Sequence, residues 1–221
     1  MQFSKRMERL ETSVFSTLDE EKQRYLKQGK EVYDFTIGSP NIAPSKEIIQ
    51  ALIDAAKQPQ SYMYALHDID ELRQTVKKWY QTRYEVELDA DTEILSLQGS
   101  QEGLAHIALA ICDEGDIVLI PSPSYPVFAN GPKIAGAEIY EMPMREEHEY
   151  LIQFDEIPKD IARKAKMMII SYPNNPTGAT APDAFYEELI RFAKANDIIV
   201  LHDTAYSNLV FDGEEGRSFL Y

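Results

Sequence analysis

The hydrophobic pattern of residues 167–206 predicts a strand, a helix and a second strand. Two short apolar runs, 167–172 and 198–201, read as strands. Between them, residues 182–196 carry apolar side chains at a spacing that places them on one face of a helix: Phe185, Leu189, Phe192 and Ala193. Two strands joined by a helix of this length run parallel, and we expect both to be buried on both faces.

Each of these two apolar runs leads into a polar cluster, at 173–178 and at 202–206. Parallel sheets bind their ligands just beyond the carboxyl ends of the strands. Asn175, Asp203 and Tyr206 fall at those ends. The sequence therefore predicts a binding site there.

Before residue 90 the pattern predicts mainly helices. Residues 1–30 form a polar arm with few apolar anchors, and 32–37 alternates as a short strand. Ser45 is expected to cap a helix over 46–57, and a further helix covers 69–84. The helix over 46–57 has a side that we expect to be buried: Ile48, Ile49, Leu52 and Ile53.

From residue 93 strands and helices alternate. Further strands are expected at 94–97, 117–120 and 137–141. The helix over 104–111 is almost wholly apolar, so we expect burial on most of its sides. The predicted fold is α/β: a three-layer α/β/α domain with a mostly parallel sheet over residues 46–221. An N-terminal arm and part of a smaller domain precede it in residues 1–45.

Composition excludes some partners without changing this fold. The 221 residues carry a formal charge of -15, which argues against nucleic acid and anionic membranes as partners. One cysteine, Cys112, lies in an apolar helical run where a buried, inert thiol is expected, and this usage fits the cytoplasm. No apolar stretch has the length of a signal peptide core or a membrane span, and no metal site is predicted.

Two further segments suggest ligand chemistry. Gly99-Ser100-Gln101 joins a strand to a helix, and a helix N-terminus offers free N–H groups to a phosphate. Many such turns bind nothing, and no nucleotide-binding glycine motif is present. Tyr125 lies between two prolines, where its ring can stack on a flat ligand or pack under a loop.

The polar residues at the strand ends suggest the rest of the ligand. The amide of Asn175 can bond a ring substituent or cap its own turn. A carboxylate at Asp203, at the end of an apolar strand, is costly unless a cation or hydrogen bonds accompany it. Tyr206 can offer its hydroxyl to the same molecule. Taken together, these residues favour a ligand with a phosphate, a flat ring and a buried positive charge.

Five stretches, in this order, make the chain resemble the class I/II aminotransferases, a fold type I family of pyridoxal-phosphate enzymes: 37–40, 99–103, 123–126, 173–178 and 203–206. The resemblance covers nearly the whole chain. It implies that Ser100 and Gln101 hold the phosphate through backbone N–H groups and that Tyr125 stacks on the pyridine ring. Asn175 and Tyr206 would bond the ring's phenolic oxygen.

The resemblance also implies roles for three other residues. Asp203 would pair with the pyridinium nitrogen, and Gly38 would approach the carboxylate of the substrate. Tyr64 would reach the phosphate in a neighbouring subunit, with Tyr62 as the alternative, because Asp68 stands where the family has a glycine.

The family's catalytic lysine follows the aspartate by a few tens of residues, and this chain has no lysine after Lys194. No catalytic residue is therefore predicted in this chain, which resembles the N-terminal part of a homodimeric, cytoplasmic aminotransferase acting on an amino acid and a 2-oxo acid. Two alternatives stay open: a non-catalytic fragment that binds the cofactor or a partner, and a pyridoxal-phosphate-dependent β-lyase on the same scaffold.

Overall fold

The computed structural model describes residues 3–10, 14–36, 38, 42–211, 213, 216 and 218–221. The chain forms two compact units: a smaller one, Thr12–Leu72, and a larger one that combines Met1–Glu11 with Arg73–Tyr221. The domain boundary predicted after residue 45 stays a prediction, because a compact unit need not coincide with a domain.

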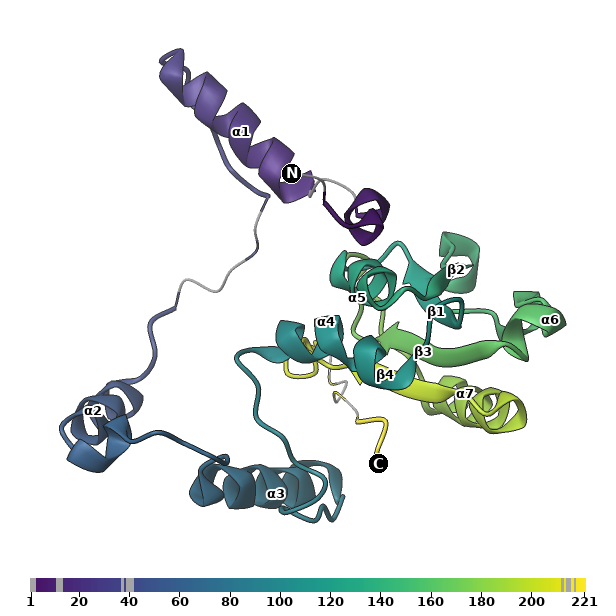
Figure 1. Cartoon of the computed structure of the whole chain (residues 1–221). Helices are drawn as coiled ribbons and strands as arrows, with labels where there is room; N and C mark the ends of the chain where they lie inside the picture. The colour runs from purple at the N-terminus through teal and green to yellow at the C-terminus, as the bar shows by residue number, and fades with distance from the viewer. Residues whose placement is uncertain are drawn as a thin grey trace. The chain divides into compact units, whose positions relative to one another are not determined.

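The larger unit is built on a parallel sheet of four strands in the order β2-β1-β3-β4 (Figure 1). The strands are β1 (Ile117–Ser122), β2 (Glu138–Pro143), β3 (Ala165–Ser171) and β4 (Ile199–Asp203). Four of the predicted strands are thereby confirmed, and so is the parallel pairing of the last two.

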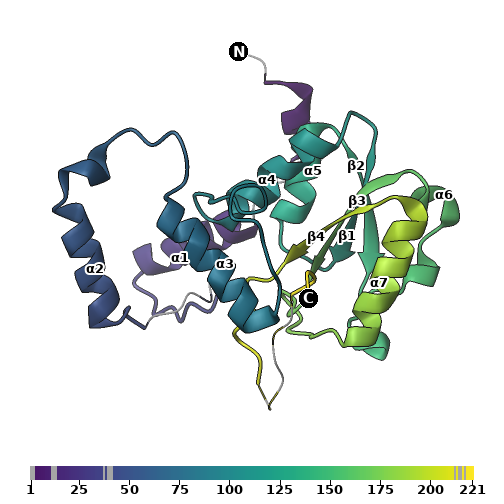
Figure 2. The ribbon, with the colours of Figure 1, turned by 90° about the horizontal axis from the view of Figure 1, so that it is seen from below.

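Helices cover both faces of this sheet (Figure 2). One face packs against α4 (Ser100–Ile111) and α5 (Val127–Ala135). The other packs against α6 (Lys159–Ala162) and α7 (Asp183–Asn196). The predicted three-layer α/β/α arrangement is confirmed.

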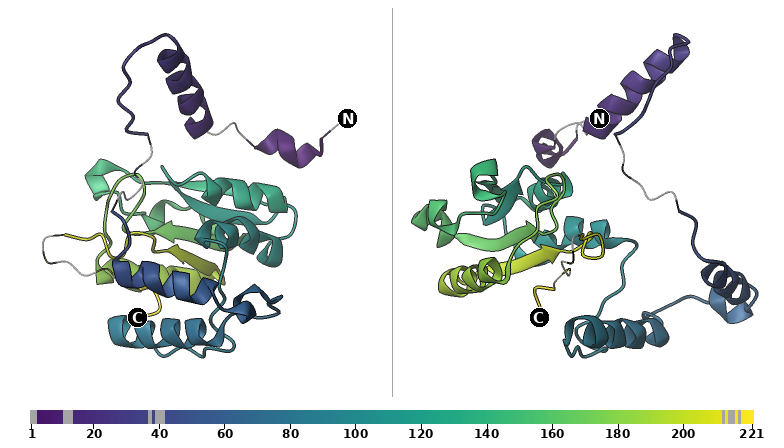
Figure 3. Two further views of the ribbon diagram at one scale, coloured as in Figure 1. Left: turned by 90° about the vertical axis from the view of Figure 1, so that its left-hand side faces the viewer. Right: turned by 180° about the vertical axis from the view of Figure 1, so that it is seen from behind.

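The alternation of side chains along β3 fills both cores. Met167 and Ile169 point into the core beneath α4 and α5, whereas Met168 and Ile170 point into the core beneath α7. All four are fully buried. The prediction that the last strand is equally buried was wrong: β4 is an outer strand, visible in yellow in Figure 3, and Ile199 is 51% exposed.

The apolar helix α4 is buried on one side only. Leu104 and Ala108 lie in the core, but Leu109 is 54% exposed. Burial on most sides was therefore a wrong expectation, because the described residues cover only the side of α4 that faces α5 and the sheet. Cys112, just after α4, is buried as expected, and burial raises the pKa of its thiol.

Two predicted strands do not form among the described residues. Residues 94–97 form no strand and pair with no described strand, and Leu95 is 78% exposed. Residues 32–36 likewise adopt no strand, and Ile37 lies outside the described residues. Alternation indicates the faces of a strand, whereas a strand also needs a hydrogen-bonded neighbour, which these segments lack here.

The remaining helices agree with the pattern in their positions. They are α1 (Val14–Lys27), α2 (Lys46–Ala56) and α3 (Asp70–Tyr84), with short 3-10 turns at Lys5–Arg9, Pro59–Tyr62, Glu146–His148 and Phe154–Glu156. The Ser45 hydroxyl accepts the Ile48 N–H at 3.5 Å and caps α2, as predicted. Within the described residues, no helix is long and apolar enough to cross a membrane.

The apolar side of α2, however, is open to solvent. Its four side chains are 42–71% exposed: Ile48, Ile49, Leu52 and Ile53. The expectation that this side is buried was wrong for the described chain. Periodicity identifies which side of a helix is apolar, but it does not supply the element that covers it.

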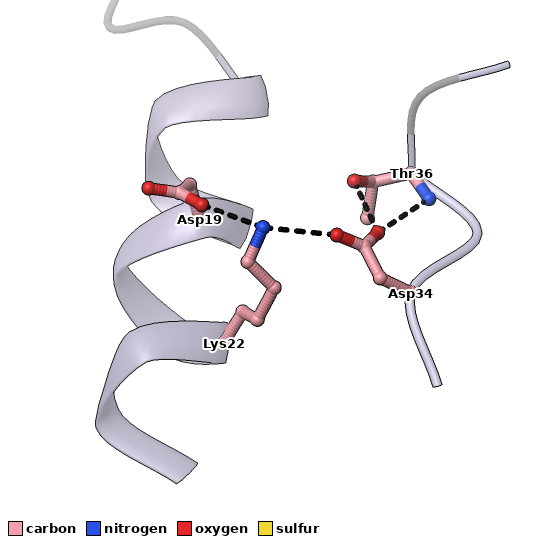
Figure 4. A network of polar contacts seen from close by, with 4 residues as sticks. All are labelled: Asp19, Lys22, Asp34 and Thr36. Atoms are coloured by element: carbon pink, nitrogen blue, oxygen red, sulfur yellow. Dashed lines mark hydrogen bonds and ion pairs between the residues drawn. The ribbon is translucent and has the colours of Figure 1, made fainter. Parts of the chain in front are cut away.

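A polar network ties α1 to the segment before Gly38 (Figure 4). The Lys22 ammonium contacts Asp19 at 2.8 Å and Asp34 at 2.9 Å. The other Asp34 oxygen accepts both the hydroxyl and the backbone N–H of Thr36. The two Thr36 bonds, followed by the Lys22 charge, lower the pKa of the Asp34 carboxyl. The network therefore shapes residues 34–36 within the smaller unit.

The contact between α4 and α5 depends on a glycine. A Cβ atom on Gly131 would lie 2.7 Å from the Leu104 carbonyl oxygen and 3.1 Å from the Ala105 carbonyl oxygen. We therefore expect Gly131→Ala to lower the free energy of unfolding by about 1–3 kcal/mol, as overpacking does. Urea denaturation measures this loss of stability. Gly115→Ala is the comparison: an added Cβ there meets no atom within 4 Å, but φ is +89°, so that variant reports the cost of backbone strain without a steric clash. An unchanged free energy of unfolding for Gly131→Ala would show that the contact between α4 and α5 accommodates an added methyl group without cost.

Candidate active site

One cavity lies at the carboxyl ends of β3 and β4, beside the start of α4. It has a volume of about 230 Å³. Its lining combines six of the predicted site residues with three others: Ser100, Gln101, Tyr125, Asn175, Asp203 and Tyr206, with Leu104, Ser171 and Ala205. Residues separated by more than 100 positions in the sequence thus surround one space.

The first turn of α4 forms one wall. Gly99 precedes the helix with a φ of +84°, a conformation that glycine adopts without strain. Ser100 and Gln101 are the first residues of the helix, where backbone N–H groups have no partner within the helix. The Glu102 carboxylate accepts the Gln98 N–H at 2.7 Å and stabilises this turn. The wall therefore suits an anionic group such as a phosphate.

Tyr125 forms a second wall, just after β1. Its hydroxyl donates to Gln101 Oε1 at 3.0 Å, and its ring packs edge-to-face on Phe128 with 6.2 Å between centroids. These contacts fix the ring at the border of the cavity, so both interpretations of Tyr125, stacking on a ligand and packing on the protein, agree with its position.

Asn175 and Tyr206 join the two strand ends across the cavity. Asn175 Nδ2 donates to the Tyr206 hydroxyl at 3.3 Å. The turn that carries Asn175 is closed by the Gly178 N–H, which donates to the Asn174 carbonyl at 2.8 Å. Since the amide of Asn175 points into the cavity and not into its own turn, it is placed to bond a ligand.

Asp203 is the last residue of β4. One of its carboxylate oxygens accepts the Ala205 N–H at 3.1 Å. Burial raises the pKa of Asp203, and no cationic side chain of the described residues forms an ion pair with it. A half-buried carboxylate without a positive partner favours a ligand that brings its own positive charge.

These residues fit a ligand with the three features expected from the sequence. Free N–H groups lie at one wall, an aromatic ring at another, and a carboxylate with an amide and a phenol at the strand ends. Pyridoxal phosphate has a phosphate, a flat ring and a ring nitrogen that carries a proton. The donor set therefore matches the cofactor that the motifs suggest, while the role of each residue stays a prediction.

The other two predicted residues, Gly38 and Tyr64, belong to the smaller unit, and Tyr64 is 89% exposed. Their proposed contacts with the substrate and with a neighbouring subunit stay predictions.

Sequence reasoning missed one polar member of the lining. Ser171 is buried, and it lies two residues after Ile169 on the face of β3 that packs beneath α4. The alternation of the strand signals this position, because the same face that carries Met167 and Ile169 must carry Ser171 at the strand end.

Comparison with known proteins identifies the family of the chain. The family model described as "Aminotransferase class I and II" matches residues 30–220. A protein named LL-diaminopimelate aminotransferase from Halothermothrix orenii is 42% identical over 221 residues. The corresponding protein from Aquifex aeolicus is 40% identical over 220 residues. The matches cover 100% and 99% of this chain but 57% of each relative, so the chain spans little more than half their length.

Solved structures show the same relationship. A substrate-bound structure of BacF from Bacillus subtilis superposes with a TM-score of 0.93 at 31% identity, covering 100% of this chain and 56% of that one. An alanine aminotransferase from Pyrococcus furiosus superposes with a TM-score of 0.89 at 27% identity, covering 99% of this chain and 56% of that one. The fold of the described chain is thus the N-terminal part of this architecture.

Proposed function

Because the chain belongs to the class I and II aminotransferases, whose cofactor is pyridoxal 5'-phosphate, we propose that its cavity binds this cofactor in an enzyme that transfers amino groups. The substrates would be an amino acid and a 2-oxo acid. The observation that carries the proposal is the convergence of six motif residues on one cavity. When bound, the cofactor supplies a ring that withdraws electrons from the reacting carbon.

The proposed roles follow the walls of the cavity. Ser100 and Gln101 hold the phosphate with backbone N–H groups at the positive end of α4. The ring of Tyr125 stacks on the pyridine ring. Asn175 and Tyr206 bond the phenolic oxygen on one edge of that ring.

Asp203 has the largest electrostatic role in this proposal. Its carboxylate would pair with the pyridine nitrogen and keep a proton on it, since a buried negative charge favours the protonated form of a neighbouring base. The proton in turn relieves the cost of burying the carboxylate. Each charge is therefore stabilised by the other.

The 221 residues do not include a lysine after Asp203. The last lysine is Lys194, on α7. The family bonds its cofactor through a lysine beyond that aspartate. We therefore expect the 221-residue chain to bind the cofactor without a covalent bond, and we assign turnover to a protein that includes such a lysine.

The names of the relatives suggest a first substrate. Proteins about 40% identical to the whole chain are named LL-diaminopimelate aminotransferase, so we propose a diamino dicarboxylic acid as the amino donor to test first. A β-lyase reaction on the same scaffold would release the substituent on Cβ together with ammonia and a 2-oxo acid and would need no amino acceptor, which distinguishes it from amino transfer. Gly38 would lie near the substrate carboxylate and Tyr64 near the phosphate of a second copy. We propose a cytoplasmic homodimer, in line with the exposed apolar side of α2.

Cofactor retention tests the proposal. The chain is mixed with pyridoxal phosphate, gel-filtered, and its absorption spectrum recorded before and after borohydride. We expect retained cofactor that borohydride does not fix to the chain. Asp155→Asn, a change at an exposed residue of the turn Phe154–Glu156 that does not line the cavity, should retain it equally. A folded wild-type chain that retains no cofactor would refute the proposal, and fixed cofactor would identify a substitute lysine by peptide mapping.

A further inference from the structure

The residue before Asp203 lies on the opposite side of β4. Strand alternation directs Asp203 to the cavity and His202 towards α7. The His202 ring contacts Tyr186 of α7, with centroids 5.6 Å apart, and Phe219, with centroids 6.2 Å apart. His202 therefore packs in an aromatic group behind the candidate active site.

The imidazole of His202 makes one hydrogen bond in this group. Its Nε2 lies 3.3 Å from the Tyr172 carbonyl oxygen. A carbonyl only accepts, so Nε2 carries the proton and donates. Nδ1 is buried and has no hydrogen-bond partner among the described residues, and burial lowers the pKa of the ring. His202 is thus a neutral donor directed at one backbone atom.

That backbone atom lies at a structurally important point. The β3–β4 ladder ends at the pair Ser171 and Asp203, and Tyr172 is the next residue. The His202 side chain continues the link between the two strands beyond the last ladder pair. The turn 173–178 begins at the next residue, and it presents Asn175 to the cavity.

The Tyr172 side chain is held as well. Its buried hydroxyl accepts the Ile152 N–H at 3.1 Å and lies 3.1 Å from the Tyr150 carbonyl, to which it donates. The side chain is thus anchored to residues 150–152, and the carbonyl is anchored to β4. Among the described residues, the bond from His202 is the one hydrogen bond that joins Tyr172, just beyond the ladder, to the strand that carries Asp203.

We propose that His202 is a positioning residue for the candidate active site: its Nε2–H bond to the Tyr172 carbonyl fixes the end of β3, and hence Asn175, relative to Asp203 and Tyr206 on β4. The 3.3 Å bond between Asn175 and Tyr206 depends on that alignment. His202 touches no cofactor itself, and its effect on cofactor binding rests on the function proposed above.

Two substitutions separate the bond from the packing. His202→Phe keeps a ring between Tyr186 and Phe219 but removes the donor. His202→Gln places an amide N–H where Nε2 lies and keeps the donor. Phe192→Leu is the control for lost packing, because Phe192 stacks on Phe154 in the same core, with 5.3 Å between centroids, and has no ring contact with Tyr172 among the described residues.

Amide hydrogen exchange in the cofactor-free chain tests the positioning directly. The reporters are the Asn174 N–H, bonded to the Ala179 carbonyl, and the Gly178 N–H, bonded to the Asn174 carbonyl. We expect His202→Phe to accelerate their exchange at least about tenfold, as local opening becomes easier, while His202→Gln and Phe192→Leu leave it within about twofold of wild type. Equal exchange in wild type and His202→Phe would overturn the proposal.

Cofactor binding gives the second measurement. His202→Phe should raise the dissociation constant of pyridoxal phosphate about tenfold, the effect of one lost hydrogen bond, and reduce the induced circular dichroism of the bound ring. His202→Gln should match wild type in both. If wild type binds no cofactor, the proposed function fails while hydrogen exchange still decides the role of His202.

If His202→Phe does not fold, a comparison of His202→Gln with His202→Asn takes its place. His202→Asn is shorter, and its amide nitrogen reaches the position of Nδ1 and not that of Nε2. We then expect His202→Gln to keep wild-type exchange and His202→Asn to lose it. Equal behaviour of these two variants would contradict a role for the Nε2 donor.

Discussion

Replacing Asp203 by asparagine is expected to weaken the binding of pyridoxal phosphate about 100-fold. The substitution keeps the shape of the side chain and removes its charge, which leaves the protonated ring nitrogen without a partner in a half-buried site. Removing one partner of a buried ion pair typically costs about 3–5 kcal/mol, and the partial exposure of Asp203 favours the lower end of that range. A titration followed by cofactor absorbance measures the dissociation constant.

The same substitution should leave the cofactor-free chain as stable as wild type or more stable. Burial raises the pKa of Asp203 in the folded chain, so its ionised form opposes folding at neutral pH. Weaker cofactor binding together with unchanged or higher stability would identify Asp203 as a residue that serves ligand binding and not folding. Asp197→Asn, just after α7, is the matched control and should bind the cofactor like wild type. An Asp203→Asn variant that binds the cofactor as tightly as wild type would exclude the ion pair.

The motifs that identify the site were readable because each occupies the end of a regular element. The strands at 117–120 and 167–172 are apolar and uninterrupted, so their ends, and the polar residues there, could be predicted from the sequence. Parallel pairing then brings Asn175 and Asp203 to the same edge of the sheet, where the structure places them.

Exposure was less predictable than position. The side of α2 that carries Leu52 and the segment containing Leu95 have the patterns of buried elements, yet both are open to solvent in the described chain. A hydrophobic pattern indicates the environment in which a segment is stable. The partner that provides this environment is a separate part of the structure, and local periodicity does not reveal whether it is present.

The role of His202 was beyond sequence reasoning for a related reason. A histidine inside an apolar strand gives no local sign of its partner, and the Tyr172 carbonyl lies 30 residues away in the chain. Only the pairing of β3 with β4 brings the two together. A positioning residue of this kind is therefore recognised from tertiary contacts and not from a motif.

This histidine should also make the stability of the chain depend on pH. Burial lowers the pKa of His202 from 6.5 to about 4, with the bond to Tyr172 opposing the shift. Below pH 6.5 the His202 imidazole of the unfolded chain binds a proton, whereas that of the folded chain stays neutral down to about pH 4. Stability therefore falls as the pH falls through this window, by up to about 3 kcal/mol from this residue alone.

The other groups that face His202 do not titrate in that range. Burial raises the pKa of Tyr186 to about 12 and raises that of Tyr172, so both phenols stay neutral. Asp203, on the far side of β4, does titrate in acid, but it is shared by wild type and by any variant at position 202. A comparison of the two proteins thus isolates the histidine.

We therefore expect wild type to lose about 3 kcal/mol more of its free energy of unfolding than His202→Gln between pH 7 and pH 4. Urea denaturation at several pH values measures both curves, and they should run parallel above pH 7. His148→Gln, in the turn Glu146–His148, is the control for the loss of a histidine away from Tyr172. Parallel curves for wild type and His202→Gln down to pH 4 would mean that the imidazole takes up its proton in the folded chain, which a ring packed between Tyr186 and Phe219 with its Nε2–H on the Tyr172 carbonyl should resist.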